Sequence, residues 1–270
     1  MRVMSAAGMR QSALAASRVP RRVARAALSS ASPQPPHPPP RKRSLYPGHL
    51  PTSPLQKVFV ACASAALAIA DPTRADMVGT LGEVTGGRAL EAIVAELRRS
   101  EDGRRILSER PVVATGGPAD AARLRSDCAP GTFGRAYGEF MEHHGFDADD
   151  RSPVALVDDA DAAYALLRYR QVHDYWHVLT GLPPTLGGEV ALKWFEVAHL
   201  KLPVALFSAL LGPAHLTAAE RTSLKETQIP WALEAGADCA PLLAVPYEDR
   251  FHVKIDDLRA DLRLRPCPPG

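Results

Sequence analysis

The chain has 270 residues, of which 46% are hydrophobic and 23% charged, the ordinary balance of a globular protein with a sizeable core. Its formal net charge of +2 is unevenly distributed, because residues 1–45 contain nine Arg and Lys and no acidic residue. Subtracting those nine charges leaves −7 for the rest of the chain. An acidic body argues against a nucleic-acid partner, since nucleic-acid binding needs a basic face to meet phosphates.

The first 32 residues, MRVMSAAGMRQSALAASRVPRRVARAALSSAS, are rich in Arg, Ala and Ser, which is typical of an organelle transit peptide. The Pro-rich stretch PQPPHPPPRKR follows and favours neither helix nor sheet. We therefore predict that residues 1–49 are a disordered targeting segment and linker, removed on import up to about residue 45, and that residues 50–270 form the folded domain. A basic tail without a targeting role is the alternative.

The next segment, Val58–Ala70, is apolar but has only 13 residues, whereas a membrane-spanning helix needs about 20. We predict a buried core helix that stops at Asp71–Pro72. The four cysteines show no CxxC spacing, which indicates free thiols in a reducing compartment. They are Cys62, Cys128, Cys239 and Cys267.

Most segments after residue 55 repeat apolar residues every three or four positions, the period of an amphipathic helix. Residues 87–100 place four apolar side chains on one stripe. Another helix is predicted from an N-cap at Asp158 or Asp159 to Gly181, and the next from Gly187–Glu189 to Gly212–Pro213. Because alternating strand patterns are nearly absent, the sequence predicts an all-α fold with a single compact helical domain.

The segment HDYWHVLTGLPPTLGGE begins with two histidines four residues apart. At 100° per residue, His173, His177 and Asp174 fall within an arc of about 100° on one helix, so their side chains can converge. The turn reverses the chain, and the helix predicted to begin at Gly187–Glu189 runs back antiparallel and brings Glu189 toward the imidazoles. Two histidines with two carboxylates suit zinc, and also iron or manganese. The alternative is a polar seam between helices, and the spacing alone does not decide between them.

The stretch YRQVHDYWHVLTGLPPTLGGEVALKWFE resembles the signature of the fourth-named protein family of coenzyme Q (ubiquinone) biosynthesis: His-Asp-x-x-His, eleven residues, then Glu. His177 and Glu189 are separated by eleven residues, so the spacing fits without a gap. The resemblance covers about residues 50–265. Further stretches that resemble the family are DPTRADMVGTLGEVTG, GRRILSERP, PGTFGRAYGEFM, IPWA and DDLRADL.

The resemblance implies an α-helical homodimer on the matrix side of the mitochondrial inner membrane, held peripherally in a complex with other coenzyme Q biosynthesis proteins. It implies that His173, Asp174, His177 and Glu189 hold a divalent metal, usually written as zinc. The implied activity removes the C1 carboxylate of a 4-hydroxy-3-methoxy-5-polyprenylbenzoate and leaves that position hydroxylated. Zinc has no redox chemistry, so this oxidation requires O2, a redox-active metal or a partner protein.

Two other functions stay open. The family has also been described as a non-catalytic organiser, so the protein could be a lipid-binding scaffold with a structural metal. Adjacent His-Asp in an all-α fold is also the hallmark of HD-type phosphohydrolases. The candidates for the further ligands of such an enzyme are His143, His144 and Asp238, but no matching context surrounds them.

Two basic residues are predicted to bind the substrate, while the catalytic residues are unassigned. Arg170 lies at about 60° on the same helix wheel, one turn before the histidines, and faces the metal. The alternative for Arg170 is an ion pair with Asp174 at the i,i+4 spacing. Lys193, four residues after Glu189, has the same two interpretations.

The segment Val197–Leu216 is apolar nearly all round. We predict that it serves the polyprenyl tail and the membrane surface, with a kink at Pro203. A plain core or dimer helix is the alternative.

Overall fold

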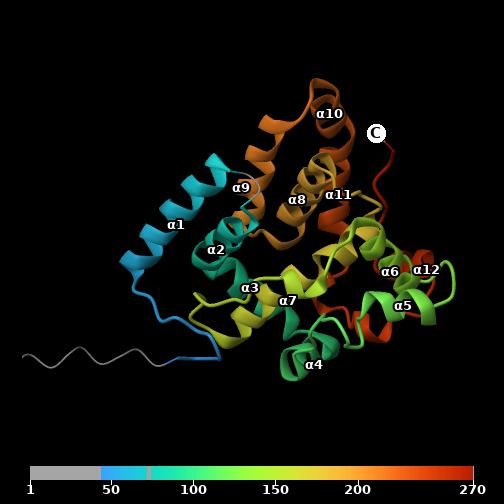
Figure 1. Ribbon diagram of the computed structural model, residues 1–270, viewed down its shortest axis with the longest axis horizontal. Coiled ribbons are helices and arrows are strands. Elements are labelled where there is room, and N and C mark those ends of the chain that lie inside the picture. Colours follow the sequence, from blue (N-terminus) through green and yellow to red (C-terminus); the bar gives the residue numbers. More distant parts are fainter. Residues whose placement is uncertain (1–43, 72–73, 270) are drawn as a thin grey trace, which may run out of the picture. The chain divides into compact units, whose positions relative to one another are not determined.

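The computed structural model describes residues 44–71 and 74–269, so residues 1–43 of the predicted targeting segment and linker lie outside the described residues. The described part is helical and contains no β-strand, which confirms the all-α prediction (Figure 1). The helices are α1 (Pro54–Ala70), α2 (Ala75–Thr85), α3 (Gly87–Leu97), α4 (Glu101–Glu109), α5 (Ala121–Asp127), α6 (Phe133–His144), α7 (Ala160–Thr180), α8 (Leu186–Leu200), α9 (Pro203–Leu211), α10 (Ala218–Ser223), α11 (Ile229–Asp238) and α12 (Ile255–Asp261). Single turns are η1 (Ala148–Asp150), η2 (Gly212–His215), the π-helical η3 (Leu224–Gln228), η4 (Leu242–Ala244) and η5 (Tyr247–Asp249).

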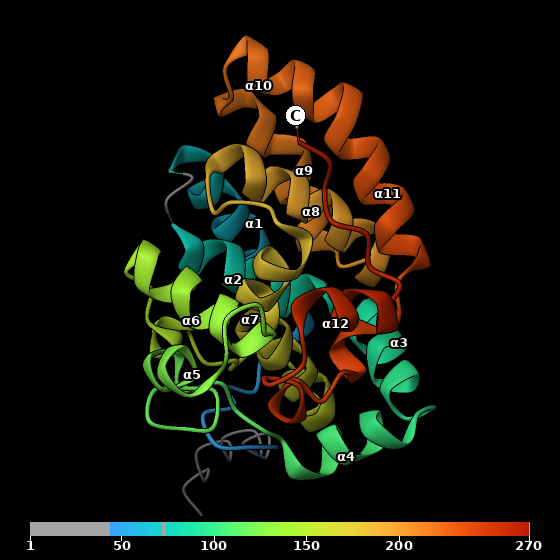
Figure 2. The same ribbon diagram turned by 90° about the vertical axis from the view of Figure 1, so that its right-hand side faces the viewer.

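Helix α7 is buried along most of its length and contacts α3, α4 and α6 (Figure 2). It begins after Asp159, whose side chain accepts a hydrogen bond from the amide of Ala162, and it ends at Gly181, which has a φ of 74°. Both ends match the predicted N-cap and C′ glycine. The predicted stripe on α3 is also confirmed, since its four apolar side chains are buried.

Helices α8 and α9 were predicted as one kinked helix, and the structure separates them. Lys201 ends α8 with a left-handed φ of 56°, and Pro203 becomes the first residue of α9. Proline lacks the amide proton that would continue the hydrogen-bond ladder, and its ring clashes with the preceding turn, so the chain breaks at this point. Helix α8 packs against α9 and α11.

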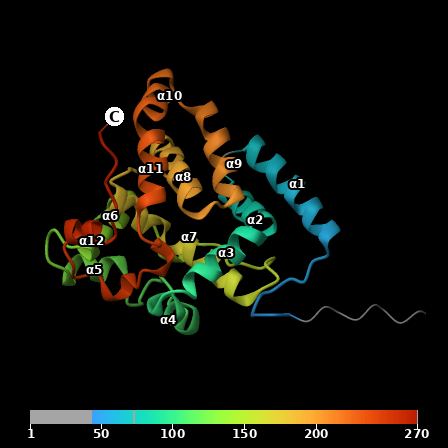
Figure 3. The same cartoon turned by 180° about the vertical axis from the view of Figure 1, so that it is seen from behind.

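The prediction that the first helix is buried in the core is wrong. Helix α1 packs against α2 through small residues, with Ser64 and Ala68 buried. Its large apolar side chains face outward, and Leu55 and Phe59 are 79% and 74% exposed. The physical reason is that small side chains allow close approach of α2, so the larger ones occupy the opposite side. Helix α9 also packs against α2 (Figures 1 and 3). Its large leucines are exposed as well.

The exposed large apolar side chains of these two helices are named here the α1/α9 apolar set. They are Leu55, Val58, Phe59, Leu67 and Ile69 on α1 and Leu206, Leu210 and Leu211 on α9. Within the described ranges, no helix is both long enough and apolar enough to cross a bilayer.

Residues before α1 also pack against the helical part. The Tyr46 hydroxyl donates to the carbonyl of Val157 at 2.8 Å, and the buried His49 pairs with Asp158 at 3.1 Å. The amide of Leu50 donates to the carbonyl of Ala155 at 2.8 Å. The contacts of the helical part therefore extend a few residues before the predicted boundary at residue 50.

Candidate metal centre

Three side chains from α7 and α8 converge on one point. The Nε2 atoms of His173 and His177 are 3.2 Å apart, and Glu189 places its carboxylate oxygens 3.3 Å from the first and 3.1 Å from the second. One ligand atom from each residue lies within 4.8 Å of the others. The spacing of four residues stacks the histidines on adjacent turns of α7, and Thr185 caps α8 so that Glu189 lies in its first turn.

The hydrogen bond at Nδ1 of each imidazole leaves Nε2 as the nitrogen that faces Glu189. Nδ1 of His177 lies 3.0 Å from the carbonyl of Leu182, which can only accept a hydrogen bond, so this nitrogen carries the proton. Nδ1 of His173 lies 2.7 Å from the Glu196 carboxylate and donates in the same way. When both imidazoles are neutral, this arrangement leaves a lone pair on each Nε2, and Glu189 adds acceptor oxygens. Such a set of acceptors needs a proton or a metal ion between its atoms, and the three ligand atoms could hold a divalent metal.

Without a metal, a proton would meet the same requirement. Burial and the Lys193 ammonium oppose protonation of His173, but the carboxylates of Glu189 and Glu196 outweigh them and raise the pKa of His173 to about 9. Burial opposes ionisation of Glu189 as well, but the two imidazoles hold the pKa of Glu189 far below its usual range. Loading a divalent metal at neutral pH should therefore displace a proton from this centre.

A buried polar group that was not predicted from the sequence surrounds the Nδ1 side of His173. Glu196 on α8 has no exposed side-chain surface and accepts hydrogen bonds from His173, from the Tyr169 hydroxyl at 2.6 Å and from the Lys193 ammonium at 2.8 Å. Tyr169 precedes His173 by one helical turn, and Glu196 follows Glu189 by two. Helical spacing from the signature residues is the signal that could have identified both.

The structure does not bring Asp174 to this group. Its buried carboxylate pairs with Arg151, in the segment between η1 and α7. His173 and His177 lie 40° apart on the helix wheel, whereas Asp174 is a further 60° away and reaches a different neighbour. Glu189, on α8, contacts His173 and His177.

Arg170 is not placed at the converging atoms either. Its guanidinium donates to the Glu83 carboxylate at 2.9 Å, to the carbonyl of Gly79 at 2.7 Å and to the carbonyl of Ser152 at 3.1 Å. Glu83 also accepts hydrogen bonds from two backbone amides, those of residues 155 and 156. Arg170 on α7 and Glu83 on α2 together anchor residues 152–156, which lie just before α7. Lys193, by contrast, lies close to the candidate metal ligands, because its partner Glu196 also contacts His173.

The comparisons with known proteins agree with the resemblance. Residues 46–268 match the family model described as "Coenzyme Q (ubiquinone) biosynthesis protein Coq4". The chain belongs to the Coq4 family. A COQ4 homolog of Bos taurus, named a mitochondrial ubiquinone biosynthesis protein, is 42% identical over 224 residues, covering 83% of this chain and 84% of the relative. The corresponding Homo sapiens protein is 40% identical over 225 residues, with the same coverage of both chains. Coq4 membership gives this chain a role in coenzyme Q biosynthesis.

A solved structure has the same fold at low sequence identity. A crystal structure from Nostoc punctiforme, described as a ubiquinone biosynthesis protein, matches with a TM-score of 0.59 at 21% identity. The match covers 78% of this chain and 98% of that chain. It supports the helical fold of the Coq4 family member described here.

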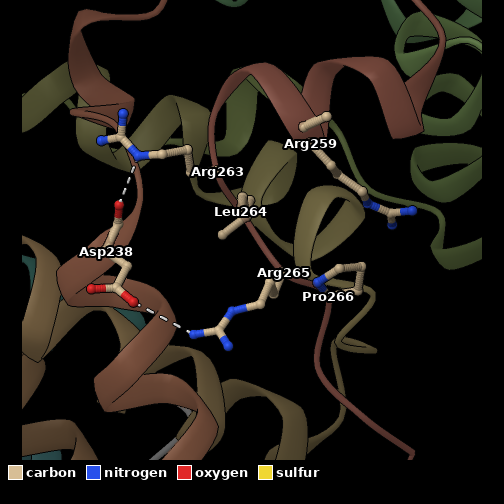
Figure 4. Close-up of a pocket in the computed structure, with 7 residues that line it drawn as sticks. Asp238, Arg259, Arg263, Leu264, Arg265 and Pro266 are labelled. Atoms are coloured by element: carbon tan, nitrogen blue, oxygen red, sulfur yellow. Dashed lines mark hydrogen bonds and ion pairs between the residues drawn. The ribbon is translucent and has the colours of Figure 1, made fainter.

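The residues considered for an HD-type phosphohydrolase lie outside the group of converging ligand atoms found in the described part. His143 and His144 are exposed at the end of α6, and Phe140 of the same helix stacks on His177 with a centroid distance of 5.8 Å. Asp238 lies at a hollow of about 550 Å³ lined by three arginines (Figure 4). There, its carboxylate pairs with Arg265 at 3.5 Å and its carbonyl accepts from Arg263 at 3.2 Å. These contacts give Asp238 partners other than the converging histidines.

Proposed function

We propose that this Coq4 protein catalyses the metal-dependent C1 decarboxylation of a 4-hydroxy-3-methoxy-5-polyprenylbenzoate, in which CO2 leaves, a hydroxyl group takes its place, and O2, a redox-active metal or a partner protein accepts the two electrons. The observation that carries the proposal is the convergence of two Nε2 lone pairs and a carboxylate in a centre where both histidines are held as Nδ1–H tautomers. Family membership supplies the pathway, and the substrate is the one that the resemblance implies.

The proposed metal ligands are His173, His177 and Glu189, and zinc suits two imidazoles with one carboxylate. Three protein ligands would leave a coordination position for substrate, as they do in catalytic zinc sites. A bound metal supplies Lewis acidity toward a substrate carboxylate or ring oxygen. Glu189 is 38% exposed at its side chain, whereas His177 is 1% exposed, so the solvent side of the centre lies at Glu189. We place substrate entry on that side.

Lys193 is proposed to favour an anionic substrate. Burial works against its charge, but the carboxylate of Glu196 outweighs burial and raises the pKa of Lys193 above its usual range, so it stays an ammonium ion. With a divalent ion bound, the two carboxylates of Glu189 and Glu196 and the ammonium of Lys193 leave one net positive charge. A benzoate carries one negative charge, so the electrostatic match favours its binding. In this proposal Arg170 does not bind substrate, and its role is the structural contacts described above.

The α1/α9 apolar set is proposed to serve the membrane and the polyprenyl tail. Large exposed apolar groups on a soluble protein mark contact with a membrane, a ligand or another protein. Each methylene transferred from water gains about 0.8 kcal/mol, so a long isoprenoid tail requires an apolar environment while the ring reaches the metal. We place the protein peripherally on the matrix side of the mitochondrial inner membrane, as a homodimer within a complex of coenzyme Q biosynthesis proteins.

A turnover assay tests the activity. Purified protein with metal added back should release CO2 from a short-chain analogue and form the hydroxylated product, and His177→Ala should abolish both. Repeating the assay without O2 shows whether dioxygen or another oxidant takes up the electrons. Tight binding of the analogue without any product, under all metals tested and with partner proteins present, would instead favour the non-catalytic scaffold.

A further inference from the structure

Glu196 is a fully buried carboxylate that is placed against a proposed metal ligand. Its Oε1 lies 2.7 Å from Nδ1 of His173, and its Oε2 accepts from both Tyr169 and Lys193. Lys193 also donates to the Tyr169 hydroxyl at 3.1 Å, which closes a small network around Glu196. A buried carboxylate is strongly destabilising unless it is paired and hydrogen-bonded, and this one has a donor on each oxygen.

The two histidines are held in different ways. The Nδ1 of His177 donates to a backbone carbonyl, whose position is set by the turn after α7. The Nδ1 of His173 donates to a side-chain carboxylate that is itself anchored by an ammonium and a phenol. A charged acceptor makes a stronger hydrogen bond than a carbonyl and raises the basicity of the opposite ring nitrogen. The orientation and donor strength of His173 therefore depend on one residue that can be changed.

We propose that Glu196 is a positioning residue for the metal: it holds His173 in the Nδ1–H tautomer with Nε2 directed at the ion, and Tyr169 and Lys193 hold Glu196 in place. This inference rests on the metal centre of the proposed function and is independent of the decarboxylation. Glu196 binds no metal itself, since its oxygens are taken by the three donors. Its role is to set how tightly His173 binds.

The test compares Co²⁺ binding to the full-length parent and to Glu196→Gln. Glutamine keeps the size of the side chain but removes the charge, and its NH2 group can face His173 and disfavour the Nδ1–H tautomer. We expect the variant to bind Co²⁺ about 10- to 100-fold more weakly by calorimetric titration, the usual effect of losing such a partner. The visible absorption of bound Co²⁺ should also change, since the ligand field at His173 changes.

Glu83→Gln is the matched control. Glu83 is also a buried carboxylate that accepts from an Arg and two backbone amides, but it touches none of the three metal ligands. Its substitution should lower the melting temperature while leaving Co²⁺ affinity within about twofold. If both variants lose affinity equally, the effect comes from general destabilisation and the positioning role is overturned.

Tyr169→Phe keeps the test decisive if Glu196→Gln does not fold, because it removes only one donor to Glu196. We expect a smaller loss of Co²⁺ affinity in the same direction and an upfield shift of the His173 Nδ1–H proton in the NMR spectrum of the Zn²⁺-loaded protein. Parent-like affinity and an unchanged resonance would overturn the inference while the metal centre stands. A parent that binds no metal would overturn both the inference and the proposed function.

Discussion

Two regions of this protein depart from the usual distribution of polar and apolar side chains, in opposite directions. Around α7 and α8, polar groups are buried: His177 is 1% exposed and Glu196 is fully buried. On α1 and α9, apolar groups are exposed: Phe59 is 74% and Leu210 59% exposed. Buried polar groups and exposed large apolar groups are the informative departures, because each costs free energy unless something satisfies it.

The two regions differ in what would satisfy them. In the buried region, Nδ1 of His173 and of His177 each has a hydrogen-bond partner. The two Nε2 atoms and the Glu189 carboxylate converge, so a single ion could bind all three side chains. The exposed region consists of hydrocarbon side chains, and a broad apolar surface, such as the lipid of the proposed membrane contact, would cover it. Under the proposed function, the polar head of the substrate and its apolar tail are therefore bound by separate helices.

The largest expected effect concerns the exposed region. Leu206→Glu combined with Leu210→Glu should weaken binding to liposomes of inner-membrane composition about 100-fold, because losing burial of two half-exposed leucines costs about 3 kcal/mol. Metal content should be unchanged. Leu233→Glu on α11, where the leucine is 42% exposed, is the matched control and should keep parent-like binding. A folded double variant that binds liposomes as tightly as the parent would remove α9 from the lipid contact.

The buried region should show its need for a cation as a pH dependence. The folded-state pKa of His173 is raised from 6.5 to about 9, so its contribution is present below pH 6.5 and is lost as pH rises to 9. In chelator-treated protein this loss amounts to about 3 kcal/mol. Zn²⁺-loaded protein should lack this slope, since the ion replaces the proton. Urea unfolding of both forms from pH 6.5 to 9 measures it, and identical slopes would show that no metal displaces the proton.

Truncated chains test how much the residues just before α1 contribute to stability. A chain beginning at Ser44 should melt at the temperature of the full chain, because the composition of the preceding residues cannot build a packed core. Beginning at Pro51 instead removes the contacts of Tyr46 and His49 with the segment before α7. We expect a loss of about 2 kcal/mol, or roughly 4–8 °C. Equal melting of the two truncated chains would mean that these contacts contribute nothing.

The smallest effect is expected for Arg170→Lys, which tests the border of the metal centre. Lysine keeps the charge opposite Glu83 but loses the fork that also reaches the carbonyls of Gly79 and Ser152. Stability should fall by about 1 kcal/mol, with metal content and substrate affinity unchanged. The reverse pattern, in which substrate affinity falls and stability does not, would restore the predicted substrate role.

The sequence was sufficient for the features that depend on local spacing. Helix α7 begins and ends where Asp159 and Gly181 predict, and the four-residue spacing of His173 and His177 is enough to bring their Nε2 atoms together. Long-range neighbours could not be predicted in this way. Nothing local shows that Asp174 turns to Arg151, or that the large side chains of α1 face outward, because both depend on which helix arrives alongside.

The metal content of the purified protein, measured by elemental analysis, tests most directly whether the buried polar region is a metal centre. The parent should carry one divalent ion per chain after loading with Zn²⁺ and desalting, and His177→Ala should carry almost none, because two ligands rarely retain an ion through desalting. Asp174→Asn, which changes the neighbouring aspartate of the signature, should keep the ion. Equal metal content in the parent and in His177→Ala would contradict the claim.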